Sequence, residues 1–224
     1  MTDRPADHRA SAIVFWRHGR TAWNADGRLQ GQSDIELDET GHQQISAAAQ
    51  ALATTFPSAT IITSDLKRAH RTAAELSDLT GQQPIIDTRL RERSFGEWEG
   101  LSRDVIAERW PELFAAWHSG TDAVAKPPGG ESRQEVGLRV AEAVREHAAQ
   151  VPEGEVLLVV SHGAAITAAI TTLIGEDAGL WHGITGLDNA NWSVLVPARS
   201  TPNWRIVGHN MGAAALSVGE VFGA

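Results

Sequence analysis

The 224-residue sequence contains no cysteine, and this absence excludes disulfides, catalytic thiolates and cysteine zinc sites. It also has no run of 18 apolar residues, so we expect no membrane-spanning helix. Residues 1–11 are polar and lack the apolar stretch of a secretory signal, which predicts a disordered lead-in. Without such a signal, the expected location is the cytoplasm.

Positive charge is scarce as well. The 19 Lys and Arg residues are outnumbered by 28 Asp and Glu residues, which leaves a net charge of −9. A surface this acidic is not expected to bind nucleic acid or an anionic membrane. If the ligand is an anion, a local group of arginines must attract it against the overall charge of the protein.

What the sequence does contain is a sizeable apolar fraction, 42%, arranged in alternating strand and helix patterns. This alternation predicts an α/β fold, a three-layer α/β/α sandwich around a mostly parallel sheet. Short linkers predict one domain over residues 12–224. The expected strands are 12–16, 59–63, 84–87, 155–160, 192–196 and 204–207, the last two as an edge hairpin followed by an irregular tail after His209. The expected helices are 38–56, capped by Asp38; 64–81, capped by Ser64-Asp65 and ended by Gly81; 132–151, with a Ser132 capping box; and 164–174.

Residues 95–128 or thereabouts interrupt this alternation. Trp98, Trp110, Phe114 and Trp117 are interleaved with charged residues, and the stretch ends in Lys-Pro-Pro-Gly-Gly. We expect a helical covering segment rather than a separate domain. The favoured interpretation of the aromatic residues is packing of the covering helices. The alternative is that one or two tryptophans face a cleft and stack on a sugar ring.

Polar residues stop two buried strands abruptly. Arg17-His18-Gly19 follows the first strand, and Ser161-His162-Gly163 ends the fourth. Ligands of open α/β sheets bind beyond the carboxyl ends of the strands, so both ends are candidates for one site.

Arg68 and Glu92 complete a set that suits phosphoryl transfer. That reaction needs donors around the phosphoryl oxygens, an in-line nucleophile and a proton donor for the leaving oxygen. Arginine forks match phosphate geometry, and an imidazole nitrogen is a nucleophile that neighbouring arginines keep neutral. A carboxyl group protonates the leaving oxygen and then deprotonates water. Taken singly, each residue also has an ordinary interpretation: a structural histidine, a solvated arginine beside Lys67, or a glutamate in a surface charge run.

Several spaced motifs, in this order, resemble branch 1 of the histidine phosphatase superfamily, the phosphoglycerate-mutase-like family. They are Arg17-His18-Gly19-Arg20-Thr21-Ala22-Trp23-Asn24, Leu29-Gln30-Gly31, Leu37-Asp38-Glu39-Thr40-Gly41, Ser64-Asp65-Leu66-Lys67-Arg68-Ala69, Leu90-Arg91-Glu92, Phe95-Gly96-Glu97-Trp98-Glu99-Gly100, Gly130-Glu131-Ser132 and Ser161-His162-Gly163.

This resemblance implies roles for individual residues. His18 would become phosphorylated, Arg17, Arg68 and His162 would hold the phosphoryl group, and Glu92 would be the proton donor. Asn24, Gln30, Gly31 and Gly163 would add contacts to the phosphate. The family uses no metal for this chemistry and no cofactor is expected, and the histidines show no H-x-x-x-H spacing.

The expected function is a phosphatase acting on a small phosphorylated metabolite. A cofactor-dependent phosphoglycerate mutase is the main alternative, but it would need more cations over the site than Arg103, Arg109 and Lys126. Residues 128–133 and 189–192 resemble actinobacterial glucosyl-3-phosphoglycerate phosphatases, and an α-ribazole phosphatase or a broad-specificity acid phosphatase would share most of these residues. An inactive phosphate-binding scaffold is a remote alternative, because all five catalytic positions are present. A homodimer is compatible with the sequence, which does not specify an oligomeric state.

Overall fold

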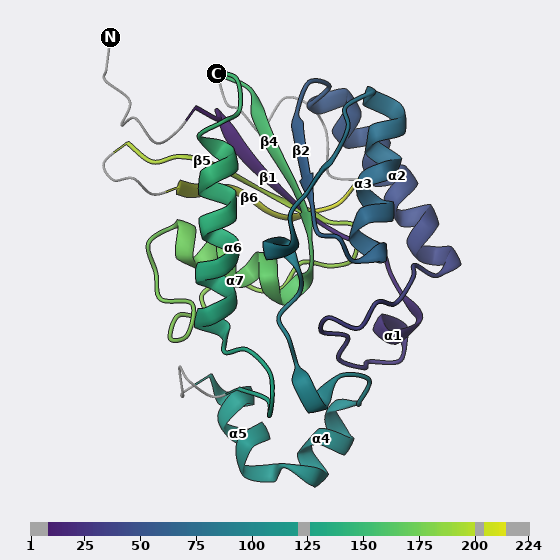
Figure 1. The fold of residues 1–224 in the computed structure, drawn as a ribbon, viewed down its shortest axis with the longest axis vertical. Helices are drawn as coiled ribbons and strands as arrows, with labels where there is room; N and C mark the ends of the chain where they lie inside the picture. Colours follow the sequence, from purple (N-terminus) through teal and green to yellow (C-terminus); the bar gives the residue numbers. More distant parts are fainter. Residues whose placement is uncertain (1–8, 121–125, 200–203, 214–224) are drawn as a thin grey trace.

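The structure is a computed structural model that describes residues 9–120, 126–199 and 204–213 (Figure 1). Its described strands form one six-stranded sheet in the order β3-β2-β4-β1-β5-β6. The strands are β1 (Ala12–Arg17), β2 (Thr60–Thr63), β3 (Ile85–Ile86), β4 (Val156–Ser161), β5 (Trp192–Pro197) and β6 (Trp204–Met211). Parallel pairing joins β3, β2, β4 and β1, whereas β5 runs antiparallel to both β1 and β6. The predicted mostly parallel sheet with an edge hairpin is therefore confirmed.

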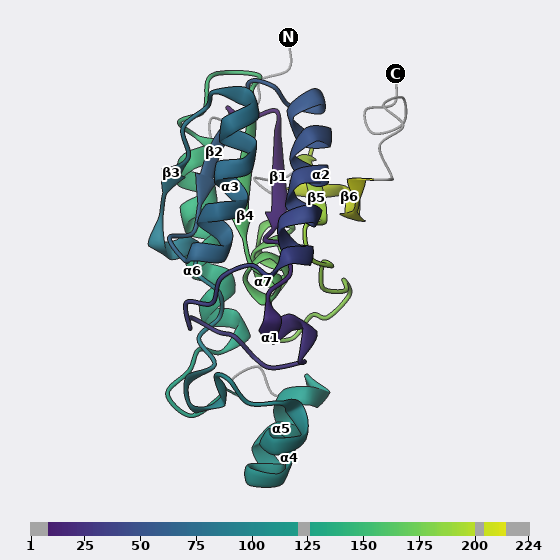
Figure 2. The same cartoon turned by 90° about the vertical axis from the view of Figure 1, so that its right-hand side faces the viewer.

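Helices cover both faces of the sheet, which gives three layers (Figures 1 and 2). The helices are α1 (Ala22–Ala25), α2 (Glu39–Thr55), α3 (Lys67–Thr80), α4 (Arg103–Arg109), α5 (Pro111–Ser119), α6 (Arg133–Ala148) and α7 (Gly163–Leu173). Alternate residues of β1 serve the two faces: Ile13 and Phe15 pack with α6 and α7, and Val14 and Trp16 pack with α2 and α3. Burial of both faces explains why the strand has a continuous apolar sequence.

Helix ends follow the predicted caps with one exception. The Asp38 side chain accepts a hydrogen bond from the Gly41 N–H, and Gly81 ends α3 in the left-handed conformation. Ser132 and Glu135 form the predicted capping box of α6. The prediction that Ser64-Asp65 caps α3 was wrong, because the N-cap position is Leu66. A carboxylate oxygen from another loop, Asp34 Oδ1, accepts from the Lys67 N–H instead.

Several boundaries also differ from the prediction. Strand β6 continues to Met211 because it pairs with β5, so the expected irregular tail does not begin at His209. Helix α6 ends at Ala148, three residues before Val151. The lead-in expected to be disordered up to residue 11 ends earlier, because the N–H groups of Ala10 and Ser11 donate to backbone carbonyls. Residues 1–8 and the last residues of the tail lie outside the described ranges.

The covering segment contains α4 and α5, which lie beyond the end of the sheet toward which β1 points (Figure 2). Two 3₁₀ turns, Thr88–Leu90 and Gly96–Trp98, connect it to β3. Trp98 is fully buried in a separate apolar cluster with Phe95 and Ile106, against which Trp110, Phe114 and Trp117 pack. The favoured interpretation, aromatic packing of the covering helices, is therefore confirmed for most of these residues. In the part of the chain that is described, no helix combines the length and apolarity needed to span a bilayer.

Candidate active site

The two His-Gly motifs meet at one edge of the sheet. In the parallel pair β1–β4, Arg17 stands opposite Ser161, so both strands end at the same level. The His18 N–H donates to the Ser161 carbonyl across 3.1 Å, which continues the pairing one residue further. The rings of His18 and His162 consequently lie with their centroids 5.1 Å apart.

His18 is held in a defined protonation state. Its side chain is 2% exposed, and its Nδ1 lies 2.7 Å from the Gly19 carbonyl oxygen, an acceptor that requires a proton on Nδ1. The pKa of His18 lies well below its ordinary value, because burial and then the charges of Arg68 and Arg17 disfavour the imidazolium. His18 is therefore neutral, and its Nε2 carries a lone pair.

His162 has the opposite arrangement. Its Nδ1 accepts a hydrogen bond of 3.2 Å from Arg68 Nε, so the proton of the neutral ring must reside on Nε2. Burial, followed by the charge of Arg68, holds the pKa of His162 well below its ordinary value. Within the described residues its buried Nε2 has no hydrogen-bond partner, and an anion would supply one.

Arg68 is fully buried, contrary to its ordinary interpretation as a solvated charge. Besides His162, its guanidinium donates to the carbonyls of Ser33 and Gly31, each across 2.7 Å. Burial lowers the pKa of Arg68 to about 10, so the group stays charged at neutral pH. Three fixed acceptors orient the guanidinium, and two of its five N–H groups have no partner among the residues that the structure describes.

Arg17 supplies the second cation. Its Nη1 donates to the carbonyl of Leu187, in the connection between α7 and β5, and its buried Nε has no partner among the described residues. Burial lowers the pKa of Arg17 from its ordinary value, and the charge of Glu92 opposes that shift. Gly163 lies beside this guanidinium, and a Cβ there would be 3.4 Å from Arg17 Cζ, an ordinary van der Waals contact.

Glu92 lies at the N-terminus of α7 and is 8% exposed. Its Oε1 accepts from the N–H groups of Arg93 and Ala165, both across 2.8 Å. Among the described residues, its Oε2 accepts one bond, a longer one of 3.2 Å from the Ala164 N–H. Oε2 is thus the oxygen with room to carry a proton toward a ligand.

Three further predicted residues line the same space. The Oδ1 of Asn24 is occupied by Thr21 and Asn189, which leaves its amide end for a ligand. The Oε1 of Gln30 is buried and has no partner within the described ranges. Gly31 has φ +54°, and a Cβ there would lie 2.1 Å from the Glu99 carboxylate, so only glycine fits.

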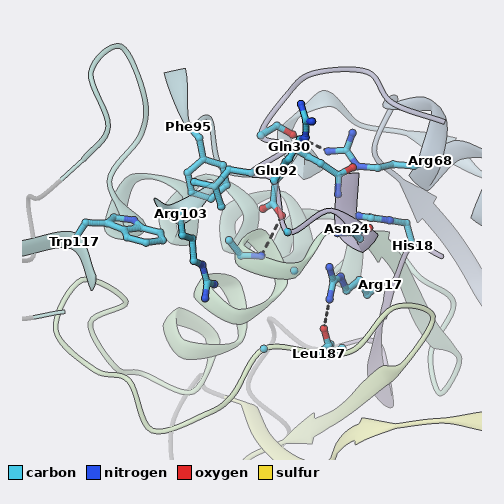
Figure 3. A pocket seen from close by; sticks show the side chains of 17 residues that line it. Arg17, His18, Asn24, Gln30, Arg68, Glu92, Phe95, Arg103, Trp117 and Leu187 are labelled. Carbon is cyan, nitrogen blue, oxygen red and sulfur yellow. Dashed lines mark hydrogen bonds between the residues drawn. The ribbon is translucent and has the colours of Figure 1, made fainter. Parts of the chain in front are cut away.

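One cavity of about 510 Å³ is lined by eight of the nine predicted residues. Figure 3 shows Arg17, His18 and Glu92 around it. The ninth predicted residue, His162, contacts Arg68. At the other end the cavity is lined by Phe95, Trp117 and Arg103 (Figure 3). The sequence singles out Trp117 as a cleft-facing candidate and Arg103 as a cation over the site, but not Phe95 as a lining residue. Nor does it single out Leu187, which no pattern could reveal, because any residue can offer a backbone carbonyl to Arg17.

The chain matches the family model "Histidine phosphatase superfamily (branch 1)" over residues 13–211. It is 39% identical over 194 residues to a glucosyl-3-phosphoglycerate phosphatase of Mycobacterium tuberculosis, an alignment that covers 84% of this chain and 86% of the relative. It is 35% identical to a metal-independent phosphoserine phosphatase of Arabidopsis thaliana, over 74% of this chain and 70% of that protein.

Solved structures agree with these relatives. A mycobacterial glucosyl-3-phosphoglycerate phosphatase in complex with VO3 superimposes with a TM-score of 0.81 at 36% identity. The alignment covers 91% of this chain and 100% of that one. The three-layer fold and the covering segment therefore lie within a known architecture.

Proposed function

Because the chain belongs to branch 1 of the histidine phosphatase superfamily and is a phosphatase, we propose that it works through a phosphohistidine on His18. The observation that supports this most strongly is the pairing of two buried neutral histidines with opposite tautomers. One offers an Nε2 lone pair and the other an Nε2–H donor, beside two arginines. A nucleophile and donors for the phosphoryl oxygens are the components that this transfer requires.

The first half-reaction transfers the phosphoryl group to the protein. The His18 Nε2 lone pair forms the N–P bond while the P–O bond to the leaving group breaks. Arg17, Arg68 and the His162 Nε2–H stabilise the phosphoryl oxygens. The proton on Glu92 Oε2 passes to the leaving oxygen, which departs as a neutral alcohol.

The second half-reaction returns the protein to its starting state. Glu92, now a carboxylate, takes a proton from water as the water oxygen attacks phosphorus and the N–P bond breaks. Inorganic phosphate leaves, Nε2 of His18 regains its lone pair, and Glu92 is protonated again. No step needs a metal, because the guanidinium groups supply the positive charge.

We propose glucosyl-3-phosphoglycerate as the substrate, hydrolysed in the cytoplasm. The relatives with that activity support this choice, and so does the far end of the cavity. Phe95 and Trp117 offer aromatic faces for a sugar ring, and the exposed Arg103 offers a guanidinium for a carboxylate. This is the alternative interpretation of Trp117 from the sequence, here joined to Phe95.

A substrate panel tests the proposal. Phosphosugars, phosphoglycerates, glucosyl-3-phosphoglycerate and α-ribazole phosphate are assayed for phosphate release with EDTA present. We expect the highest kcat/KM for glucosyl-3-phosphoglycerate and no effect of EDTA. Loss of all activity in EDTA would refute the metal-free mechanism. Isomerisation of phosphoglycerate faster than its dephosphorylation would favour the mutase instead.

A further inference from the structure

The proton donor Glu92 lies on an irregular segment. It stands between the 3₁₀ turns Thr88–Leu90 and Gly96–Trp98, outside any helix or strand ladder. Yet the segment is buried around it, since Leu90 and Arg93 are almost fully covered. Buried carbonyls require donors, and here regular secondary structure does not provide them. Three backbone N–H groups hold the Glu92 carboxylate directly, and side chains that bind this segment hold the backbone that carries it.

Gln32 Nε2 donates to the Glu92 carbonyl across 3.2 Å, and Arg139 of α6 supplies further donors. Its Nη1 donates to the carbonyls of Arg89 and Arg91, across 2.7 and 3.1 Å. Its Nη2 lies 3.4 Å from the Glu92 carbonyl, in a longer bond. One guanidinium thus binds the segment at three carbonyls, the last of them on the proton donor itself.

Glu131 holds Arg139 and the other side of the segment. Its carboxylate accepts from Arg139 Nε across 2.9 Å and from Nη2 across 2.7 Å, the bidentate geometry that fixes a guanidinium plane. The same carboxylate accepts from the Ser94 N–H across 2.9 Å. The Glu131 backbone also pairs with the Ser94 carbonyl and accepts from Arg93 Nε.

Neighbouring residues of the motif Gly130-Glu131-Ser132 fit the same purpose. A Cβ at Gly130 would lie 2.6 Å from the Ser94 carbonyl oxygen, so glycine permits the close approach of the two segments. Ser132 caps α6, the helix that carries Arg139. The motif is thus explained by its contacts with the segment around Glu92, although neither Glu131 nor Arg139 lines the active-site cavity.

We propose that Glu131 and Arg139 are positioning residues that set the Glu92 carboxyl group for proton transfer. The inference rests on the proposed function, in which Glu92 protonates the leaving oxygen. It predicts that loss of either residue impairs reactions that need that proton and spares reactions that do not.

Leaving-group chemistry separates this role from a merely structural one. An alkyl oxygen must be protonated as it leaves, whereas p-nitrophenolate departs without a proton. For Arg139→Met, we expect kcat/KM to fall about 10²-fold on the best alkyl phosphate of the substrate panel, the usual size of a general-acid contribution. On p-nitrophenyl phosphate we expect a fall of less than about threefold, since kcat/KM reports the steps up to transfer onto His18.

A double variant tests whether Arg139 acts through Glu92. Combining Arg139→Met with Glu92→Gln should leave kcat/KM on the alkyl phosphate within about twofold of Glu92→Gln alone, because coupled residues are not additive. Arg145→Met is the matched control on the same helix: its guanidinium is exposed and contacts the Thr172 carbonyl rather than this segment. It should leave both substrates unchanged.

Glu131→Gln keeps the inference testable if Arg139→Met fails to fold, which thermal denaturation would reveal. It preserves side-chain size but weakens the bidentate pair, so we expect the same selective loss at about 10-fold. Equal losses on both substrates, or additive losses in the double variant, would overturn the positioning role alone. A wild-type protein that hydrolyses neither substrate would instead refute the proposed function, and this assignment with it.

Discussion

The ends of β1 and β4 look alike in sequence and differ in chemistry. Each strand is buried, each ends in His-Gly, and each histidine has a pKa well below its ordinary value. The difference lies in the partner of Nδ1, which is a carbonyl oxygen for His18 and a guanidinium N–H for His162. One contact per ring therefore decides which histidine offers a lone pair and which offers a proton at Nε2.

Loss of the His18 Nε2 lone pair should lower activity more than any other change. For His18→Ala we expect kcat to fall by at least about 10⁴-fold, because the proposed covalent intermediate forms on the His18 ring. Single-turnover assays with labelled substrate should show no label on this variant. Label that persists on His18→Ala would contradict the assignment of the nucleophile.

Loss of the His162 Nε2–H donor should lower kcat by a smaller factor. His162→Asn should lower kcat by about 10²- to 10³-fold, as removal of one transition-state donor does, while labelled protein still forms. His162→Gln is the matched variant, because its longer amide can place an N–H nearer the Nε2 position. We expect Gln to retain more activity than Asn. Equal rates for the two variants would argue against the proposed donor.

Removal of Arg68, whose charge lowers the pKa of both histidines, should change the pH dependence of kcat/KM. In wild-type protein, His18 stays neutral well below pH 6.5, so its protonation should not limit kcat/KM near neutral pH. For Arg68→Gln we expect a loss of about 10²-fold at pH 7. Because a positive charge is removed, the pKa of His18 should rise, and the acidic limb of the kcat/KM profile should move to higher pH. An unmoved limb would show that Arg68 does not set this protonation state.

The smallest expected effect is on stability. The unfolded chain binds a proton at each histidine below about pH 6.5, whereas the folded protein leaves His18 and His162 neutral to well below that value. Stability should therefore fall as pH drops, by about 1.4 kcal/mol per pH unit for each histidine. His162→Gln removes one of these protons, so its stability should depend less steeply on pH in urea denaturation between pH 6 and 5. Parallel curves for the two proteins would contradict the burial of a neutral His162.

Much of this arrangement could be predicted from sequence because it is local. The apolar run of β1 and its polar end place His18 at the edge of the sheet, and the register with β4 brings His162 beside it. Asp38 and Ser132 mark helix starts through contacts within one turn. In each case the residues that form the contact lie close together in the chain or are fixed by strand pairing.

What could not be predicted depends on contacts between distant segments. Leu66 starts α3 without a side-chain cap of its own because Asp34 supplies the acceptor. The tautomer of His162 follows from Arg68, which is 94 residues away in sequence. The hydrogen bonds from Arg139 to the segment around Glu92 likewise join α6 to a distant loop. Arg139 and Arg91, for example, are 48 residues apart in sequence. Contacts between side chains so far apart in the chain leave no periodicity or motif in a single sequence from which they could be predicted.

The strongest test of the proposed phosphohistidine mechanism is the position of the phosphate on the protein. Wild-type protein is quenched in alkali during turnover, to preserve phosphohistidine, then digested and analysed by mass spectrometry and by phosphorus–proton NMR. Because Nδ1 of His18 is occupied by the Gly19 carbonyl, we expect the phosphate on Nε2 of His18. A phosphate on Nδ1 of His18, or on His162, would contradict it.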